Sequence, residues 1–366
     1  MISNPSTEPA IAFSSTTFIK FLLNPNFDHS SLETSRYSHI PVWHSRPHIP
    51  TYINYCLHDQ DSTLKMSGKN VLIIGGSGNI GAPIVAALSA EPSVAITILT
   101  REDSKSTFPA GIPVKKADYN SHSSLVAAFK GHDTIISIVN TFAVESQFKF
   151  IDAAVEAGVT RFYPSEFGSV ASSDGDDLVK TFWDRVGIHG KFEVFQRLRE
   201  LAADGKLEYT LIASGAFFDW GLTHGFIGLH LKDRKVTIFN RGDKPMSLST
   251  LGHIAKVVAW SVTHADETRN RAVRFYSHRV SQNELLEIGE KLTGTKWTVE
   301  KVTTDEWIAQ GEAGLKAGNP YAGYQVLQGL LFEDADTVDA SYLTNDAPVK
   351  VDKTVEEVFK EALDSA

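Results

Sequence analysis

The chain has 366 residues, of which 42% are hydrophobic and 22% are charged, as in an ordinary globular protein. Its formal net charge of -9 argues against a nucleic-acid partner, and the absence of an apolar run of ~18 residues argues against a membrane-spanning helix. Cys56 is the only cysteine, which excludes a disulfide framework, a thiolate zinc cluster and a cysteine redox pair, so we expect a reducing, cytoplasmic location.

The first 65 residues differ in character from the rest of the chain. They are rich in Ser, Thr, Pro, Asn and His and show no sustained hydrophobic period. Acidic residues such as Glu8 and Asp28 argue against a transit peptide, which is rich in arginine and poor in acids. Because Met66 is followed closely by the first strand, we expect it to be a real or alternative start. Residues 1–65 are then a disordered N-terminal extension or a gene-model artefact.

From Met66 onward, strand patterns alternate with helix patterns. Strands are expected at residues 71–74, 94–100, 112–116, 134–139, 161–163 and 209–213, and helices at about 121–130, 147–157, 252–263 and 281–292. This alternation predicts an α/β fold, a Rossmann-type doubly wound parallel sheet. We expect a dinucleotide-binding domain over residues 66–214. Residues 215–366 should form mainly a smaller α/β substrate-side region, with elements that return to the sheet.

A glycine cluster directly follows the first strand and precedes a helix pattern. Gly75, Gly78 and Gly81 recur every three residues. In a dinucleotide-binding turn the first glycine permits a tight turn, the second lets the backbone approach a pyrophosphate, and the third lets helix and strand pack closely. The start of the helix then offers N–H groups and a positive dipole end to phosphate. The predicted cofactor contacts in this turn are Gly75, Ser77, Gly78, Asn79, Ile80 and Gly81.

The residues after the second strand indicate which dinucleotide is bound. An enzyme that uses NAD commonly carries Asp or Glu at this place, whereas this chain has Arg101, with Lys105 close behind. A guanidinium suits a 2′-phosphate, with which it forms paired, charge-assisted hydrogen bonds. Glu102 and Asp103 are nearby and weaken this interpretation, and the alternative is a surface arginine at a strand end. We expect NADP rather than NAD.

A lysine lies on the apolar face of a helix expected to include residues 187–202. At about 100° per residue, that face carries Ile188, Val194, Phe195, Leu198 and Ala202. Lys191 lies near the centre of this stripe. An inward-facing lysine costs free energy unless it is paired, which suggests a function. Alternatively, the stem packs and the ammonium reaches water, and periodicity alone leaves both interpretations open.

Aromatic side chains gather after the last of these strands, with Phe217, Phe218 and Trp220 among them. Most are expected in the core, and those that line a cleft would suit an aromatic or otherwise apolar substrate. No metal site is expected. The acidic cluster that begins at Asp174 lacks an ordered ligand spacing and is read as a solvated loop.

From Met66 onward the chain resembles the NmrA-like and isoflavone-reductase-like branch of the atypical short-chain dehydrogenases. The resemblance is carried by the glycine motif, Arg101, the stretch 157–168 and Lys191, and its most specific part is the Pro-Ser-Glu-Phe-Gly turn at 164–168. It implies that Lys191 contacts the nicotinamide ribose and serves in proton transfer, and that the turn lies against the nicotinamide end. Asn140 and Phe167 are further expected cofactor contacts, and the expected substrate pocket is formed by Phe167, Phe217, Phe218 and Trp220.

The tyrosines support this placement by their spacing. Ordinary short-chain dehydrogenases use a tyrosine and a lysine four residues later, because the lysine lowers the pKa of the tyrosine. None of the ten tyrosines here has a lysine at that spacing; Tyr163, for instance, is followed at four by Phe167. That mechanism is therefore unavailable, and a sugar-nucleotide epimerase or dehydratase is disfavoured.

Two hypotheses from different classes remain. The first is an NADPH-dependent reductase of a small aromatic or conjugated carbonyl compound, with Lys191 as the catalytic residue. Its expected partner is a small-molecule substrate, with no nucleic acid and no membrane, and the oligomeric state stays open. The second is a non-catalytic sensor that binds NAD(P) and relays redox state to a protein partner, as the NmrA-type regulators of this family do. Because the sensors tend to lack a lysine at this position, Lys191 favours the enzyme.

Overall fold

The computed structural model describes residues 69–168, 176–333 and 344–366. Every described residue belongs to one unit of the chain, Leu64–Ala366. The extension expected over residues 1–65, the start expected at Met66 and the acidic residue Asp174 all lie outside the described residues.

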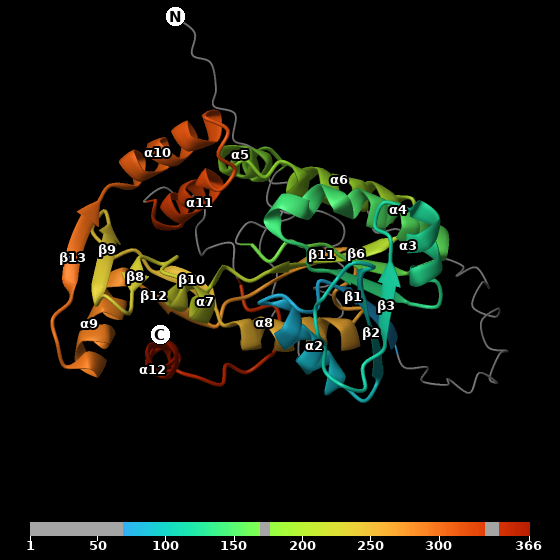
Figure 1. Ribbon diagram of the computed structural model, residues 1–366, viewed down its shortest axis with the longest axis horizontal. Coiled ribbons are helices and arrows are strands. Elements are labelled where there is room, and N and C mark those ends of the chain that lie inside the picture. Colours follow the sequence, from blue (N-terminus) through green and yellow to red (C-terminus); the bar gives the residue numbers. More distant parts are fainter. Residues whose placement is uncertain (1–68, 169–175, 334–343) are drawn as a thin grey trace, which may run out of the picture. The chain divides into compact units, whose positions relative to one another are not determined.

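A seven-stranded sheet organises the N-terminal part of this unit (Figure 1). Its strands are β1 (Lys69–Ile74), β2 (Val94–Arg101), β3 (Val114–Ala117), β4 (Thr134–Ser137), β5 (Arg161–Tyr163), β6 (Glu208–Ala213) and β11 (Arg271–Arg274). Their order is β11-β6-β5-β4-β1-β2-β3, and every neighbouring pair is parallel. The strand order reverses at β1, between β2 and β4, so the predicted doubly wound Rossmann-type sheet is confirmed.

Helices cover both faces of this sheet, as the labels in Figure 1 show. One face carries α3 (His122–Phe129), α4 (Gln147–Ala157) and α6 (Gly190–Ala203), and the other carries α2 (Gly81–Ser89) and α8 (Leu251–Thr263). Residues 71–74 of β1 are all apolar because the strand is covered on both faces there. Leu72 packs toward the first group of helices and Val71 toward the second, and both side chains are fully buried.

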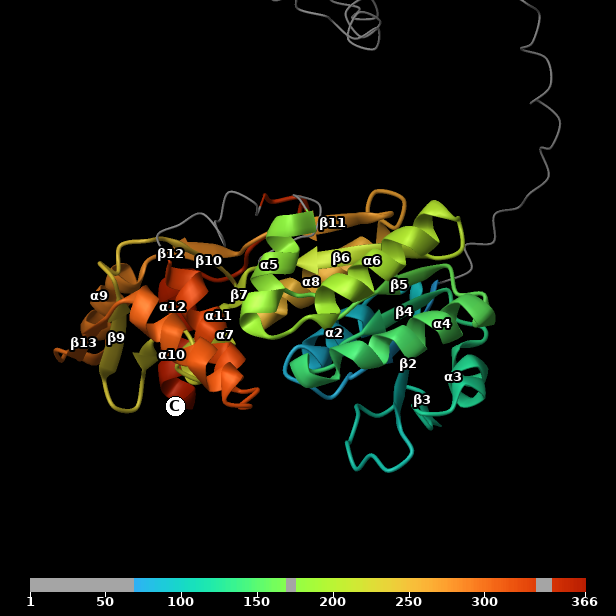
Figure 2. The same ribbon diagram turned by 90° about the horizontal axis from the view of Figure 1, so that it is seen from above.

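A smaller α/β region is built mainly from the C-terminal residues (Figure 2). One three-stranded sheet contains β7 (Ala216–Phe217), β10 (Met246–Ser249) and β12 (His278–Val280); the other contains β8 (Leu229–His230), β9 (Lys235–Phe239) and β13 (Thr298–Val302). The remaining helices are α5 (Asp176–Val186), α7 (Phe218–Thr223), α9 (Gln282–Thr293), α10 (Thr304–Lys316), α11 (Ala322–Phe332) and α12 (Val355–Ser365). Throughout the described ranges, no helix combines the length and the apolar character needed to cross a membrane.

Several element boundaries differ from those expected by a residue or more, as three examples show. Strand β3 begins at Val114 rather than at residue 112, directly after Pro113, whose nitrogen carries no hydrogen to donate to a ladder. Strand β4 ends at Ser137, and a 3-10 helix, η2 (Thr141–Ser146), follows it. The helix expected over residues 187–202 begins only at Gly190, because Gly187 has a φ of +75° and separates α5 from α6.

Candidate active site

The turn after β1 depends on glycine at two positions because of the protein's own packing. Gly75 has a φ of +83°, and a Cβ there would lie 2.0 Å from the carbonyl oxygen of Ile138. A Cβ on Gly81 would lie 2.1 Å from the carbonyl oxygen of Gly75. The turn therefore brings the end of β1, the end of β4 and the start of α2 into close contact.

Gly78 differs from these two glycines, because no neighbour in the protein requires it. Its φ lies outside the left-handed region, and a Cβ would have only the carbonyl oxygen of Gly75 within 4 Å, at 3.5 Å. The first turn of α2 begins next to it, and the N-cap residue Ile80 makes no side-chain cap hydrogen bond. An open backbone position beside an uncapped helix start fits a pyrophosphate, so this turn suits a dinucleotide.

The segment after β2 folds back onto the glycine turn. The hydroxyls of Ser77 and Ser106 lie 3.2 Å apart, which joins the two loops. Arg101 is exposed at the end of β2, and its Nε lies 3.2 Å from a carboxylate oxygen of Asp103. Lys105 is exposed in the same loop, one residue before Ser106. The structure thus places Ser77 and the two cationic residues in loops that meet beside the first turn of α2.

The turn 164–168 is fixed by hydrogen bonds to three other segments. The backbone N–H of Ser165 donates to the side chain of Gln147 at 2.7 Å, and its hydroxyl donates to the carbonyl of Val139 at 2.8 Å. The backbone N–H of Ser214 donates to the carbonyl of Gly168 at 3.0 Å. The turn is therefore held by the ends of β4 and β6 and by the start of α4, at the carboxyl edge of the sheet.

Lys191, the second residue of α6, reaches this turn. Its Nζ donates a hydrogen bond of 2.5 Å to the carbonyl oxygen of Glu166 and lies 4.2 Å from the ring centroid of Trp183. The ammonium is thus directed at the turn, which favours the functional interpretation over packing of the stem alone. Burial lowers the pKa of Lys191, and the charge of Glu166 acts in the opposite direction. A lysine with a lowered pKa gives up its proton more readily near neutral pH.

Two other expected cofactor contacts lie at the same edge. Asn140 precedes η2, and its side-chain oxygen accepts a 3.0 Å hydrogen bond from the N–H of Phe142. Phe167 has a φ of +45° and is buried in one apolar cluster with Ile80 and Ile138. The carboxyl ends of β1, β4 and β5 therefore bring together the glycine turn, Asn140 and the 164–168 turn.

The four aromatic residues expected at the substrate occupy three different environments. Phe167 and Phe217 belong to the packing beneath the sheet edge. Phe218 is fully buried in the core of the smaller region, with its ring centroid 5.2 Å from that of His278. Trp220 lines a pocket of about 590 Å³ in the smaller region.

That cavity, the aromatic pocket, is lined by Trp220, His224, Phe226, Phe239, Trp307 and Tyr324, among others. The Trp220 and His224 rings stack at 4.7 Å with an angle of 17°. The indole Nε1 of Trp307 is buried and has no hydrogen-bond partner within the described part of the chain. A cavity lined by several aromatic rings suits a flat guest.

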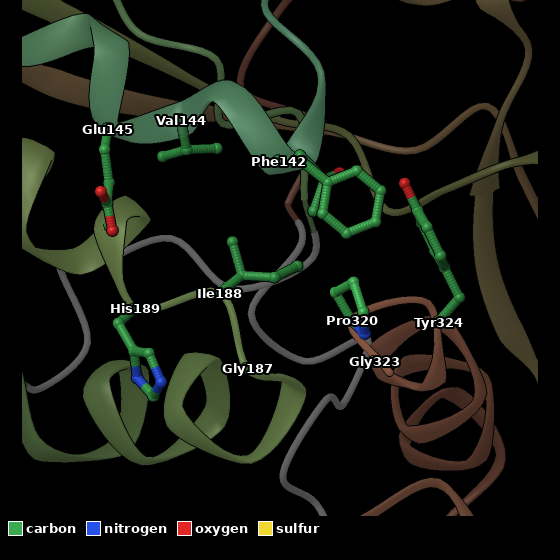
Figure 3. A pocket seen from close by; sticks show the side chains of 11 residues that line it. Phe142, Val144, Glu145, Gly187, Ile188, His189, Pro320, Gly323 and Tyr324 are labelled. Atoms are coloured by element: carbon green, nitrogen blue, oxygen red, sulfur yellow. The ribbon is translucent and has the colours of Figure 1, made fainter. Parts of the chain in front are cut away.

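A second pocket, of about 220 Å³, lies beside the start of α6 (Figure 3). Phe142 and Glu145 of η2, His189 and Gly190 before Lys191, and Tyr324 of α11 take part in its lining. The rings of Phe142 and Tyr324 lie 6.0 Å apart, and Tyr324 also lines the aromatic pocket. Tyr324 therefore links the aromatic pocket to the beginning of the helix that carries Lys191.

Sequence reasoning missed the contacts of Trp183, Glu166 and Tyr324. Trp183 lies on α5, a different helix from Lys191, so no period could connect them. Glu166 is part of the quoted turn, but an acidic residue in a turn is usually solvated and gave no signal of burial. Tyr324 comes from a helix that the expected elements did not include.

Comparison with known proteins identifies one family and several oxidoreductase relatives. The model of the NmrA-like family matches residues 67–315. The oxidoreductase aprR of Aspergillus flavus is 36% identical over 238 residues, which cover 64% of this chain and 78% of that protein. An isoflavone reductase homolog of Zea mays, IRL, is 30% identical over 261 residues, or 66% of this chain and 79% of the relative.

A solved structure shares the fold. Leucoanthocyanidin reductase of Vitis vinifera, in a binary complex with NADPH, superimposes with a TM-score of 0.61 at 21% identity, covering 80% of this chain and 99% of that one. At this identity the likeness concerns the fold. Together with the family match and the named oxidoreductase relatives, it shows that the chain belongs to the NmrA-like family and to its isoflavone-reductase-like oxidoreductases.

Proposed function

We propose that this protein is a cytoplasmic NADPH-dependent reductase of a small aromatic or conjugated carbonyl compound. The observation that carries the proposal is the position of Lys191. Its Nζ is held at the 164–168 turn, at the carboxyl edge of the sheet, where parallel α/β sheets bind their ligands. A sensor needs a dinucleotide site but does not need a proton donor held at that edge.

The residues of the first two loops would hold NADP(H). The open position at Gly78 lets a pyrophosphate approach the start of α2. Arg101 and Lys105 supply positive charge for a 2′-phosphate beside Ser77. The solved relative from Vitis vinifera carries NADPH, which supports this assignment.

The chemistry divides between cofactor and chain. The bound nicotinamide supplies the hydride that reduces the carbonyl carbon. Lys191 donates a proton to the carbonyl oxygen, so that the C=O group becomes CH–OH. Its ammonium is oriented by the Glu166 carbonyl and covered by the Trp183 ring, and both contacts limit the access of water.

The aromatic pocket supports the proposed class of substrate. Aromatic rings contribute large, rigid contact surfaces, and Gln325 and Gln328 in the same lining offer polar groups to a guest.

The test is turnover of NADPH with a panel of aromatic ketones, isoflavones and conjugated enones. The assay follows the loss of nicotinamide absorbance for the wild type, Lys191→Met and the control Lys149→Met, a change at an exposed lysine of α4. The proposal expects turnover of at least one compound, lost by roughly 10²–10⁴-fold in Lys191→Met and retained in the control. Unchanged turnover in Lys191→Met, or dinucleotide binding without turnover of any compound, would contradict it; the second result would favour the sensor.

A further inference from the structure

The side chain of Glu166 is buried, although the proposed reaction gives its carboxyl group no role. The residue is only 9% exposed, and its Oε1 has no hydrogen-bond partner among the described residues. Its neighbour Ser165, by contrast, has both its N–H and its hydroxyl bonded. Because an unpartnered buried carboxyl costs free energy, its presence in a tightly held turn suggests a function.

The local packing makes room for this carboxyl beside Trp183. A Cβ on Gly168 would lie 3.0 Å from Oε1 of Glu166 and 3.3 Å from Cζ2 of Trp183, so a larger residue at 168 would crowd both groups. The indole ring of Trp183 also covers the ammonium of Lys191 at 4.2 Å. Glu166, Trp183 and Lys191 therefore form one cluster, which we call the lysine cluster.

We propose that Glu166 is a positioning residue whose buried carboxylate keeps Lys191 in its protonated, proton-donating form. The inference rests on the proposed role of Lys191. Inside a site of low dielectric constant, a single charge is penalised, whereas an ammonium and a carboxylate compensate each other. The backbone carbonyl of Glu166 orients the Nζ. On this proposal the buried side chain of the same residue supplies the balancing charge from beside the Trp183 ring.

The electrostatics around the cluster single out Glu166. Burial lowers the pKa of Lys191 and raises that of Glu166, and each of the two groups opposes the shift of the other. Other charged groups on the surrounding elements are Glu145 in η2, Asp184 and Arg185 in α5, His189, and Glu193 in α6. Of the nearby charged groups, Glu166 is the one whose charge opposes the lowering of the Lys191 pKa.

The direct test measures the titration of Lys191 in the free protein. The chain is labelled with ¹³C at lysine Cε, and the Lys191 signal is assigned as the one absent from Lys191→Arg. The proposal expects its titration midpoint to fall by about one pH unit or more, a tenfold loss of proton affinity, in Glu166→Gln. The matched control Glu193→Gln removes an exposed carboxylate from the same helix turn and should leave the midpoint unchanged. An equal midpoint in folded Glu166→Gln and wild type would overturn the proposal.

A reciprocal measurement covers the case in which Glu166→Gln fails to fold. Linkage requires Lys191 to act on Glu166 as strongly as Glu166 acts on Lys191. Infrared spectra of Lys191→Met at neutral pH should therefore show a protonated carboxyl that is absent from the wild type. A protonated buried carboxyl already present in the wild type would contradict the proposal.

Kinetics then separate this inference from the proposed function. With a substrate in hand, Glu166→Gln should lower kcat and move the basic limb of the pH profile to lower pH, with the KM for NADPH unchanged. A merely structural role would not move that limb. If the wild type reduces no compound, the proposed function fails, and the titration of Lys191 still decides whether the two groups are coupled.

Discussion

A substitution at Gly78 should affect dinucleotide binding without affecting folding. Alanine at this position would place a Cβ no closer than 3.5 Å to any other residue's atoms, an ordinary contact, and it demands no left-handed backbone. Replacing glycine by alanine in a compatible conformation stabilises a protein by ~0.4–1 kcal/mol, through the unfolded chain. We therefore expect Gly78→Ala to fold normally, with an unchanged or slightly raised Tm.

Binding of the dinucleotide should respond in the opposite direction. The new methyl group would occupy the space through which the backbone approaches the pyrophosphate, and displacing a phosphate oxygen weakens a charge-assisted hydrogen bond. Such bonds contribute ~1.5–3 kcal/mol, which corresponds to roughly a 10- to 100-fold rise in Kd for NADPH. Calorimetric titration measures this change directly.

Two controls make the result interpretable. Gly252→Ala, in the first turn of α8, adds a Cβ that meets nothing within 4 Å and should change neither Tm nor Kd beyond a small gain in stability. Gly75→Ala combines a φ of +83° with a Cβ 2.0 Å from a carbonyl oxygen, and it should unfold the protein. If Gly78→Ala binds NADPH as tightly as the wild type, or if it unfolds, the assignment of this turn is refuted.

Three further substitutions test other parts of the account. Arg101→Ala should weaken NADPH binding by roughly tenfold or more while leaving NADH unchanged, because the guanidinium is proposed to bind the 2′-phosphate, which NADH lacks; parallel calorimetry checks this, and an equal loss for both would contradict it. Lys191→Arg keeps the charge but holds its proton too tightly to donate it, so turnover should fall by roughly 10²-fold or more at every pH, with NADPH affinity within a few-fold of wild type in fluorescence titration. His278 has a pKa lowered from 6.5 by burial, so the unfolded chain binds more protons below that pH and stability falls on acidification. Urea unfolding at about pH 7.5 and 5.5 measures how much free energy of unfolding each protein loses on acidification. The loss should be smaller in His278→Gln than in the wild type, by up to ~1.4 kcal/mol per pH unit. An equal loss in the two proteins would contradict the lowered pKa of His278.

The sheet could be predicted because its signals are local. Val71 and its neighbours form an apolar run that only a strand buried on both faces explains, and the glycine spacing after it fits one kind of turn. The predicted boundaries were wrong where a single residue changed the backbone, as Gly187 does between α5 and α6. The start of β3 moved for the same kind of reason, next to Pro113.

The surroundings of Lys191 could not be predicted in the same way. The inward direction of its side chain followed from helix periodicity, but Trp183 and Glu166 reach it from other segments, and sequence spacing carries no information about such contacts. The aromatic residues illustrate the same limit. Phe218 and Trp220 are two residues apart, yet one is fully buried in the core and the other lines a pocket, because only tertiary packing distinguishes them.

Calorimetric titration tests most directly whether this site binds NADPH for reduction. Residues 66–366 or the full chain are titrated calorimetrically with NADPH, NADP⁺, NADH and NAD⁺ under the same conditions. The account predicts that the two phosphorylated forms bind at least tenfold more tightly than the other two, since Arg101 and Lys105 lie where a 2′-phosphate would be held. Equal affinity for NADP⁺ and NAD⁺, with the reduced forms bound more weakly, would contradict the account and indicate a redox sensor.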